Sequence, residues 1–456
     1  MNIENIDIQN FSQDLKTNPE TKFIYGEIFT PLSLIEKILN LFDDSVFEDP
    51  TKKWLDAGAG TGFFSMFLYH KLNIGLQKVM SKKKQRHNHI IKNMIYMVEI
   101  REENVNKIKE LFGKNANIYH QDFLSTFNFP TFDYIIGNPP YNANGLKKVP
   151  TNNIRKKTQD GETIWISFVK KAMSLLNPRG FLSFIIPSIW MKPDKAKMYH
   201  YLTQYKIHKL VCLTNTETNK YFNKEAQTPT CYFTLEKTPT DNKIMLLDKE
   251  RNTFIHYHLK PEYPIPLFAS AIIQKLTPFI EQAGYIKVIK TNMPRKGSQF
   301  SNKKDSKHPY KNIKTSRLDG LQPTLDINYS NKPQSYYNNP KLVLAHKMYG
   351  FPYLDRDGEY GISNRDNYVI IERNNNDLCK LRDFLSTKTI LYLYESTRYR
   401  MKYLEKYAFE FIPDITNLPD FPIIINDDTI AKYFKLDEID KKNIQNYHKK
   451  SYIFSF

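Results

Sequence analysis

The segment Leu55-Asp56-Ala57-Gly58-Ala59-Gly60-Thr61-Gly62-Phe63 decides the fold that the sequence predicts for the first half of the chain. It carries a short strand, expected over residues 53–57, into a glycine-rich turn and then into a helix expected over 62–72. The glycines let the backbone approach a ligand closely, and the helix start supplies free N–H groups. Because the pattern lacks the G-K-[ST] ending of a P-loop, a P-loop phosphate site is excluded. The segment predicts a nucleotide-type pocket, and a plain strand–helix turn is the simpler alternative.

Strand and helix patterns alternate on both sides of this segment. Apolar residues at helical spacing and short apolar runs predict the following elements. Helices are expected over residues 31–42, 62–72, 102–112 and 165–176, and strands over 53–57, 95–100, 117–119, 134–137 and 181–186. Such alternation is typical of an α/β fold, in which a parallel sheet carries helices on both faces.

The alternation ends near residue 240, where the stretch 238–266 holds several prolines and turn residues. We therefore predict a first domain over residues 1–240 and a second over 241–456. The second has irregular signals with short strands, such as 341–345 and 368–371, and is expected to be mixed α+β.

Composition narrows the class of protein. The 456 residues include three cysteines, with no C-x-x-C pair, so neither a disulfide framework nor a cysteine zinc site is expected. The acidic start has no signal-peptide core, and no apolar run approaches the ~20 residues of a membrane span. A cytoplasmic, intracellular protein with no membrane partner is predicted. The formal charge of +18 favours nucleic acid as a partner, although a Lys- and Asn-rich proteome would raise it too.

A second motif, Asp133-Tyr134-Ile135-Ile136-Gly137-Asn138-Pro139-Pro140-Tyr141, ends a predicted buried strand. Two prolines stop the sheet and fix a rigid extended turn. This turn would present the Asn138 amide at the carboxyl edge of the sheet, where open α/β sheets bind ligands. Tyr141 would add a flat face, so the motif predicts a site for a planar group with an NH2. A structural loop that closes the strand is the alternative.

Two further elements lie between these motifs. Glu99 ends the next predicted strand, where an acid can bind the two ribose hydroxyls of a nucleoside. The interval from Asp56 to Glu99 exceeds the ~20 residues of a minimal unit, and the basic stretch 75–93 is expected to be a loop insertion. In Gln121-Asp122-Phe123-Leu124, Asp122 could accept from an exocyclic amine and Phe123 could stack on adenine; alone, Asp122 would be a helix N-cap.

In this order the four elements resemble S-adenosylmethionine-dependent methyltransferases, and more narrowly the gamma class of N6-adenine DNA methyltransferases, the Taq-type enzymes. The resemblance implies a Rossmann-like methyltransferase sheet that binds S-adenosyl-L-methionine in the first domain and a DNA target-recognition domain in the second. It implies methyl transfer to N6 of an adenine flipped out of double-stranded DNA.

It also implies site residues, position by position. The catalytic motif comprises Asn138, Pro139, Pro140 and Tyr141. The cofactor-binding residues are Thr30, from Tyr25-Gly26-Glu27-Ile28-Phe29-Thr30-Pro31, with Asp56, Gly58, Gly60, Glu99, Asp122, Phe123 and Asn138. Tyr141 and Phe222, the latter from Tyr221-Phe222-Asn223, would stack on the target base.

The segment 290–317 holds nine basic residues and one acid, Asp305. It predicts a DNA-binding loop through Lys296, Lys303, Lys304, Lys307 and Lys311, with a solvated surface loop as the alternative. Since the cofactor's sulfonium is already activated, neither a metal nor a covalent intermediate is expected. A monomer is expected, and any DNA cleavage would belong to a separate cognate restriction endonuclease.

Other functions are compatible with these residues. N-P-P-Y also serves enzymes that methylate RNA bases or protein glutamine, and a DNA-binding specificity protein with an inactive pocket is a non-catalytic alternative. Methylation of cytosine C5 needs a cysteine nucleophile, typically after a proline, and none of the three cysteines follows one.

Overall fold

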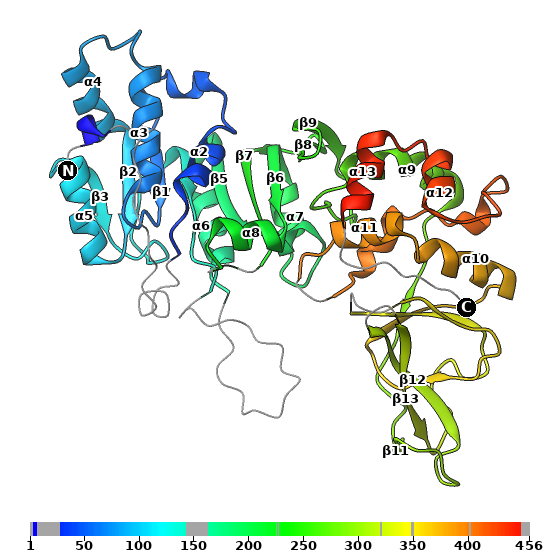
Figure 1. The fold of residues 1–456 in the computed structure, drawn as a ribbon. Coiled ribbons are helices and arrows are strands. Elements are labelled where there is room, and N and C mark those ends of the chain that lie inside the picture. The colour runs from blue at the N-terminus through cyan, green and yellow to red at the C-terminus, as the bar shows by residue number, and fades with distance from the viewer. Residues whose placement is uncertain are drawn as a thin grey trace. The chain divides into compact units, whose positions relative to one another are not determined.

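The computed structural model describes residues 3–6, 28–142, 163–224, 226, 228–319, 322–347, 351–400 and 403–447 (Figure 1). The chain divides into two compact units. The first comprises Met1–Leu247 and Phe254–Pro261, and the second comprises Asp248–Thr253 and Glu262–Phe456. Each unit is described by itself below.

The first unit is built on a nine-stranded sheet with the order β3-β2-β1-β4-β5-β7-β6-β8-β9. Strands β1 to β5 run parallel to one another, whereas β7 is antiparallel to both β5 and β6. The strands are β1 (Trp54–Ala57), β2 (Ile95–Glu99), β3 (Asn117–His120), β4 (Phe132–Gly137), β5 (Leu176–Pro187), β6 (Tyr205–Leu213), β7 (Thr230–Pro239), β8 (Lys243–Asp248) and β9 (Thr253–His258).

Helices cover the central strands. All four residues of β1 are buried although successive side chains point to opposite faces, so both faces of the sheet are covered there. The helices of this unit are α2 (Leu32–Leu39), α3 (Phe63–Gly75), α4 (Lys83–His89), α5 (Glu102–Phe112), α6 (Trp165–Leu175), α7 (Met198–Thr203) and α8 (Asn215–Tyr221). The predicted α/β fold is confirmed, and the predicted strands and helices of its first part all occur.

Two local predictions differ from the structure. The stretch 75–93 is no plain loop, because it contains α4, and a π-helical turn, Ile90–Met94, joins α4 to β2. Residues 177–180, expected to separate a helix from a strand, lie within β5. Phe132 pairs with Leu176, and Tyr134 pairs with Phe181. Residues 177–180 therefore have no partners on β4 and bulge out of the sheet, and Arg179 among them has a φ of 63°. The sheet also continues past residue 240, through β8 and β9.

The second unit combines helices with two four-stranded sheets, ordered β10-β17-β14-β15 and β11-β13-β12-β16. Its strands are β10 (Ile289–Lys290), β11 (Phe300–Ser301), β12 (Tyr310–Asp319), β13 (Gln322–Ser330), β14 (Lys341–Ala345), β15 (Tyr353–Asp355), β16 (Gly361–Ile362) and β17 (Asn367–Ile370). Its helices are α9 (Ser270–Ala283), α10 (Asn375–Leu385), α11 (Lys388–Ser396), α12 (Asp427–Tyr433) and α13 (Glu438–Asn446). The expected α+β character is confirmed. The segment 290–317, expected to be a loop, contains β11 and most of β12.

None of the helices in the described ranges combines the length and the apolar content that crossing a membrane requires.

Candidate functional site

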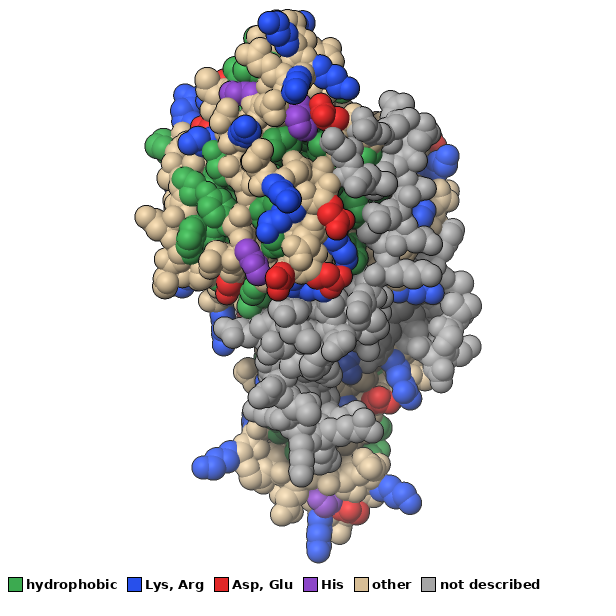
Figure 2. All heavy atoms as spheres, turned by 90° about the vertical axis from the view of Figure 1, so that its left-hand side faces the viewer, with side chains coloured by type: hydrophobic (Ala, Val, Ile, Leu, Met, Phe, Trp, Pro, Cys, Tyr) green, Lys and Arg blue, Asp and Glu red, His purple; other side chains and the backbone are tan. Residues whose placement is uncertain are grey.

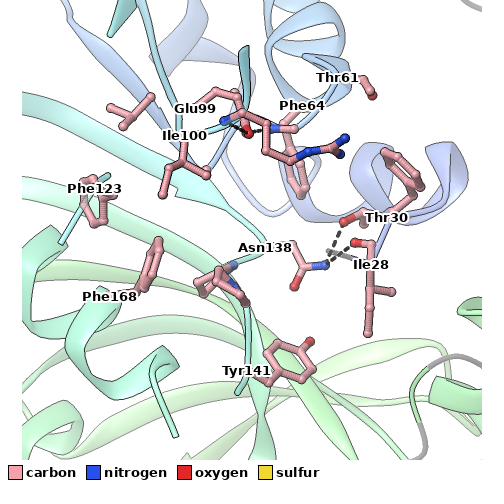
Figure 3. Close-up of a pocket in the computed structure, with 18 of the residues that line it drawn as sticks. Ile28, Thr30, Thr61, Phe64, Glu99, Ile100, Phe123, Asn138, Tyr141 and Phe168 are labelled. Atoms are coloured by element: carbon pink, nitrogen blue, oxygen red, sulfur yellow. Dashed lines mark hydrogen bonds between the residues drawn. The ribbon is translucent and has the colours of Figure 1, made fainter. Parts of the chain in front are cut away.

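A cavity of about 360 Å³ opens at the carboxyl ends of β1, β2 and β4, within the range typical of small-molecule sites (Figure 3). Open α/β sheets bind ligands just outside the carboxyl ends of their strands, and this cavity lies at that edge of the sheet. Its walls contain every predicted cofactor, catalytic and stacking residue except Asp56, namely Thr30, Gly58, Gly60, Glu99, Asp122, Phe123, Asn138, Pro139, Pro140, Tyr141 and Phe222.

The glycine-rich turn is held against the neighbouring strand. The N–H groups of Gly58 and Ala59 both donate to the Val98 carbonyl, at 3.1 and 2.8 Å. Gly62 has a φ of +88°, and a Cβ there would approach Ile108 to 3.2 Å, so glycine suits this position for two reasons. The turn leads directly into α3, whose first residues Phe63 and Phe64 also line the cavity.

Glu99 is fixed by the chain around it. Its Oε2 accepts a hydrogen bond from the Gly60 N–H at 2.8 Å, and its Oε1 accepts one from the Arg101 N–H at 2.9 Å. The side chain is only 6% exposed. A carboxylate has about four lone-pair sites, so this fixed group can still accept from ligand hydroxyls. Arg101, which also lines the cavity, was not among the predicted residues.

Asp56 lies outside the cavity lining and is 1% exposed. Its Oδ2 accepts from the Ser65 hydroxyl at 2.9 Å, which ties β1 to the first turn of α3. Its Oδ1 has no partner among the described residues. Burial raises the pKa of this carboxyl to about 7, against a smaller lowering by Ser65. These contacts make Asp56 a support of the glycine turn, in contrast to the wall position that the resemblance suggests.

Apolar side chains gather at one side of the cavity. The buried ring of Phe123 packs against Phe168 of α6, with centroids 5.2 Å apart. Ile100, which is 47% exposed, lines the cavity as well. Asp122 is exposed, and its Oδ1 accepts from the Leu124 N–H at 2.9 Å in a local turn, without capping a helix. Sequence reasoning missed Ile100 and Phe168, and the only signal for Ile100 is its place directly after Glu99.

Asn138 is anchored from the opposite wall. Its Nδ2 donates to the Thr30 hydroxyl at 3.0 Å and makes a longer contact of 3.5 Å with the Ile28 carbonyl (Figure 3). Its Oδ1 is buried and has no partner among the described residues. Because a carbonyl can only accept, the contact with Ile28 favours the orientation that leaves Oδ1 free. The side chain therefore presents an unpaired acceptor at the cavity wall.

Two aromatic side chains complete the lining. Tyr141 follows the two prolines, and its hydroxyl is buried without a partner among the described residues. Burial raises the pKa of this phenol well above its usual value, so it stays neutral. Phe222, which is 3% exposed, directly follows α8. A capping box between Thr214 and Glu217 fixes the start of that short helix.

The predicted DNA-binding lysines lie in the second unit, around β11 and β12. Lys296, Lys303, Lys304 and Lys307 are exposed. Lys311 instead pairs with Glu359, which raises the pKa of its ammonium, and lies 5.6 Å from the Tyr360 ring centroid. Its charge is partly neutralised within the unit, so it is less available to phosphate than the other four.

Comparison with known proteins relates the cavity-bearing part of the chain to methylases. Residues 32–222 match the family described as Eco57I restriction-modification methylase. The chain is 29% identical over 133 residues to the type II methyltransferase M.AccI of Acinetobacter calcoaceticus, across 27% of this chain and 24% of that protein. It is 24% identical over 243 residues to an uncharacterized adenine-specific methylase of Mycoplasma pneumoniae, across 36% of this chain and 56% of that protein. The matches thus span about a quarter and about half of these relatives.

Solved structures give more distant matches. The M protein of the type I restriction enzyme EcoKI aligns at 16% identity with a TM-score of 0.37, covering 48% of each chain.

Proposed function

We propose that this protein is a site-specific DNA methyltransferase of the gamma class, which transfers a methyl group from S-adenosyl-L-methionine to N6 of adenine. The observation that carries the proposal is the Asn138 amide, which lines the cavity: Thr30 holds its Nδ2, and its buried Oδ1 has no partner among the described residues. An acceptor fixed in this way selects a ligand with an N–H donor. The family match and the relative described as an adenine-specific methylase support the same reaction.

The cavity residues fit the proposed cofactor. The buried hydroxyl of Thr61 and Oδ1 of Asn138 have no partner among the described residues and are available to a polar ligand. Glu99 would accept from the ribose hydroxyls, and Ile100, Phe123 and Phe168 would enclose the adenine ring. The glycine turn would lie along the methionine portion. When bound, S-adenosylmethionine supplies a methyl group already activated by its sulfonium.

The chemistry requires the chain mainly to position the target. The lone pair of adenine N6 is delocalised into the ring, which makes this nitrogen a poor nucleophile. Oδ1 of Asn138 and the Pro139 carbonyl would accept from the two N6 hydrogens and favour a more tetrahedral nitrogen. Catalysis would then rest on orientation and on fixed dipoles, with no covalent enzyme intermediate.

An adenine stacked inside a duplex is out of reach of this wall, so it would have to be flipped out. Tyr141 and Phe222 both line the cavity and would hold the ring between them. The second unit would supply target recognition, with phosphate contacts from Lys296, Lys303, Lys304 and Lys307. One protomer has the residues that the reaction needs, so we propose a monomer, with cleavage left to a separate restriction endonuclease.

The test is to incubate the purified protein with S-adenosylmethionine and unmethylated duplex DNA, digest the DNA and quantify N6-methyladenine by mass spectrometry. Wild type should produce the modified nucleoside, and Asn138→Ala should produce none while it retains its thermal unfolding profile. Asn376→Ala, at an exposed position of the second unit, is the matched control and should keep full activity. Cofactor binding without modified DNA would refute the DNA substrate. Substantial activity in Asn138→Ala would refute the role of the amide.

A second substrate class is compatible with the same wall, because the carboxamide of a glutamine side chain or an RNA adenine also presents an NH2 to an acceptor. Assaying RNA and protein methylation in parallel with DNA would separate these possibilities.

A further inference from the structure

The stretch 75–93 forms a basic surface that the proposed reaction does not use. It contains five lysines and one arginine, with no Asp or Glu. Lys78, Lys82, Lys83, Lys84 and Lys92 are all exposed. Figure 2 shows this end of the first unit at the top of the view, where several Lys and Arg side chains project from the surface. We call these five lysines the α4 basic face.

The surface is built on firm anchors. Arg86 is 5% exposed and donates to the Asn73 side chain at 2.8 Å and to the Met80 carbonyl at 2.6 Å. His87 contacts the Tyr69 hydroxyl at 2.8 Å, and His89 contacts the Pro50 carbonyl at 2.8 Å. The inward side chains thus hold α4 in place, and the lysines are left to point outward.

The five lysines of this face have no partners within the described part of the chain, whereas some other lysines of the unit do. In the first unit, Lys52, Lys107 and Lys209 each lie within ion-pair distance of a carboxylate. None of the five lysines of the α4 basic face has an ion pair or a side-chain hydrogen bond among the described residues. The charge of all five lysines is therefore left without a compensating carboxylate among the described residues.

The position of the charges on the helix is unfavourable for the helix itself. Lys82 is the N-cap of α4, and Lys83 and Lys84 occupy its first turn, which holds no acid. Cations at a helix N-terminus oppose the macrodipole, at a cost of typically ~0.3–1 kcal/mol each. Local helix stability therefore does not explain why Lys82, Lys83 and Lys84 occupy these positions.

The face is remote from the cavity. Helix α3 begins at the cavity with Phe63 and ends at Gly75, where the basic stretch starts. Its 13 residues place the two ends about 20 Å apart. In Figure 1, α4 lies near the upper end of α3. A duplex that delivers its base to the cavity therefore does not have to pass over this face.

We propose that the α4 basic face is a second binding surface for the phosphate backbone of duplex DNA, so that one protein molecule can hold two DNA segments. Five exposed lysines on one short helix and its flanks concentrate positive charge on one part of the surface, and lysine binds phosphate without regard to sequence. Such a surface would help the enzyme pass from one segment to another. The exposed Ile74 and Val79 nearby make an acidic protein surface the competing occupant.

A bridging experiment tests this proposal. One short duplex is immobilised, the protein is bound to it, and retention of a second, fluorescent duplex is measured at increasing salt. Wild type should retain the second duplex. The triple variant Lys82→Gln/Lys83→Gln/Lys84→Gln should still bind the first duplex, but its affinity for the second duplex should fall at least about tenfold. The salt slope of this second binding step should be smaller by about 2 to 3. Lys82→Arg/Lys83→Arg/Lys84→Arg keeps the charge and should bridge like wild type.

The outcomes separate the two proposals. If the glutamine variant bridges as well as wild type, the α4 basic face is not a DNA surface. Self-association of the protein would then explain the bridging, and a protein partner would be the occupant of the face. The same variant should methylate a short duplex at the wild-type rate, because its changes lie outside the cavity. If the protein bridges two duplexes but transfers no methyl group, the second DNA surface is supported and the proposed reaction is refuted.

Discussion

Replacing Thr30 by valine tests whether the Asn138 amide is oriented by the chain before any ligand binds. Valine has nearly the shape of threonine but lacks the hydroxyl that accepts from Asn138 Nδ2 at 3.0 Å. Thr30 is 8% exposed, so water cannot readily replace the lost partner. The amide would then keep only the 3.5 Å contact with the Ile28 carbonyl.

The magnitude follows from the buried N–H that is left without its partner. Such a loss costs about 1–3 kcal/mol. If all of it appears in the transition state, the rate of transfer falls by about 5- to 150-fold. Thr30→Ser restores a hydroxyl at the same place and should recover most of the rate.

The assay is a single-turnover measurement with saturating S-adenosylmethionine and duplex DNA, together with the KM for the cofactor. We expect the rate to fall in Thr30→Val with little change in KM. A variant that is as fast as wild type would show that the hydroxyl does not orient Asn138. A loss confined to KM would instead place Thr30 in direct contact with the cofactor, as the family resemblance implies.

Four further perturbations follow from the structure. Glu99→Gln weakens the charge-assisted bonds from two backbone N–H groups and should lower cofactor affinity by about tenfold or more in calorimetry, with a smaller effect on the saturated rate. Burial raises the pKa of Asp56 to about 7, so the folded protein holds a proton that the unfolded chain releases near pH 4. The free energy of unfolding should therefore fall by up to a few kcal/mol as pH rises from about 4 to 7. Asp56→Asn should flatten that part of the pH profile. Lys341 and Asp355 form a pair that is 0% and 3% exposed, so Lys341→Ala should cost about 3–5 kcal/mol in chemical denaturation, and a matched apolar double variant should be less destabilised. The last perturbation neutralises three exposed lysines of the second unit, namely Lys303, Lys304 and Lys307. It should reduce the salt slope of DNA binding by about 2 to 3, and an unchanged slope would rule out their phosphate contacts.

The residues that sequence analysis located are those whose chemistry or backbone geometry is unusual. A turn with glycines at positive φ, an acid that ends a strand, and an amide before two prolines each leave a local signature. Phe168 and Ile28 leave none, because an ordinary apolar side chain and a backbone carbonyl become part of the site only through tertiary packing. The pairing of Lys311 with Glu359 is likewise invisible in a count of basic residues.

Helix α4 shows the same limit in another way. Its sequence, Lys-Lys-Gln-Arg-His-Asn-His, has no apolar face, so periodicity predicts a loop. Tertiary hydrogen bonds from Arg86, His87 and His89 supply the stabilisation that an apolar stripe usually gives. Polar anchors of this kind depend on partners distant in sequence, and no local pattern reveals them.

The two key polar groups of the cavity share a design that bears on what it can bind. Glu99 is the last residue of β2 and Asn138 directly follows β4, yet each is fixed by the chain itself: backbone N–H groups hold the carboxylate, and Thr30 holds the amide nitrogen. In both cases the atoms left to face a ligand are hydrogen-bond acceptors. A wall that offers fixed acceptors rewards ligands that bring donors, such as ribose hydroxyls at Glu99 and an exocyclic amine at Asn138. A ligand with acceptors at either place would meet repulsion, and this asymmetry is the physical reason to favour an adenine N6 over a carbonyl-bearing base beside Asn138.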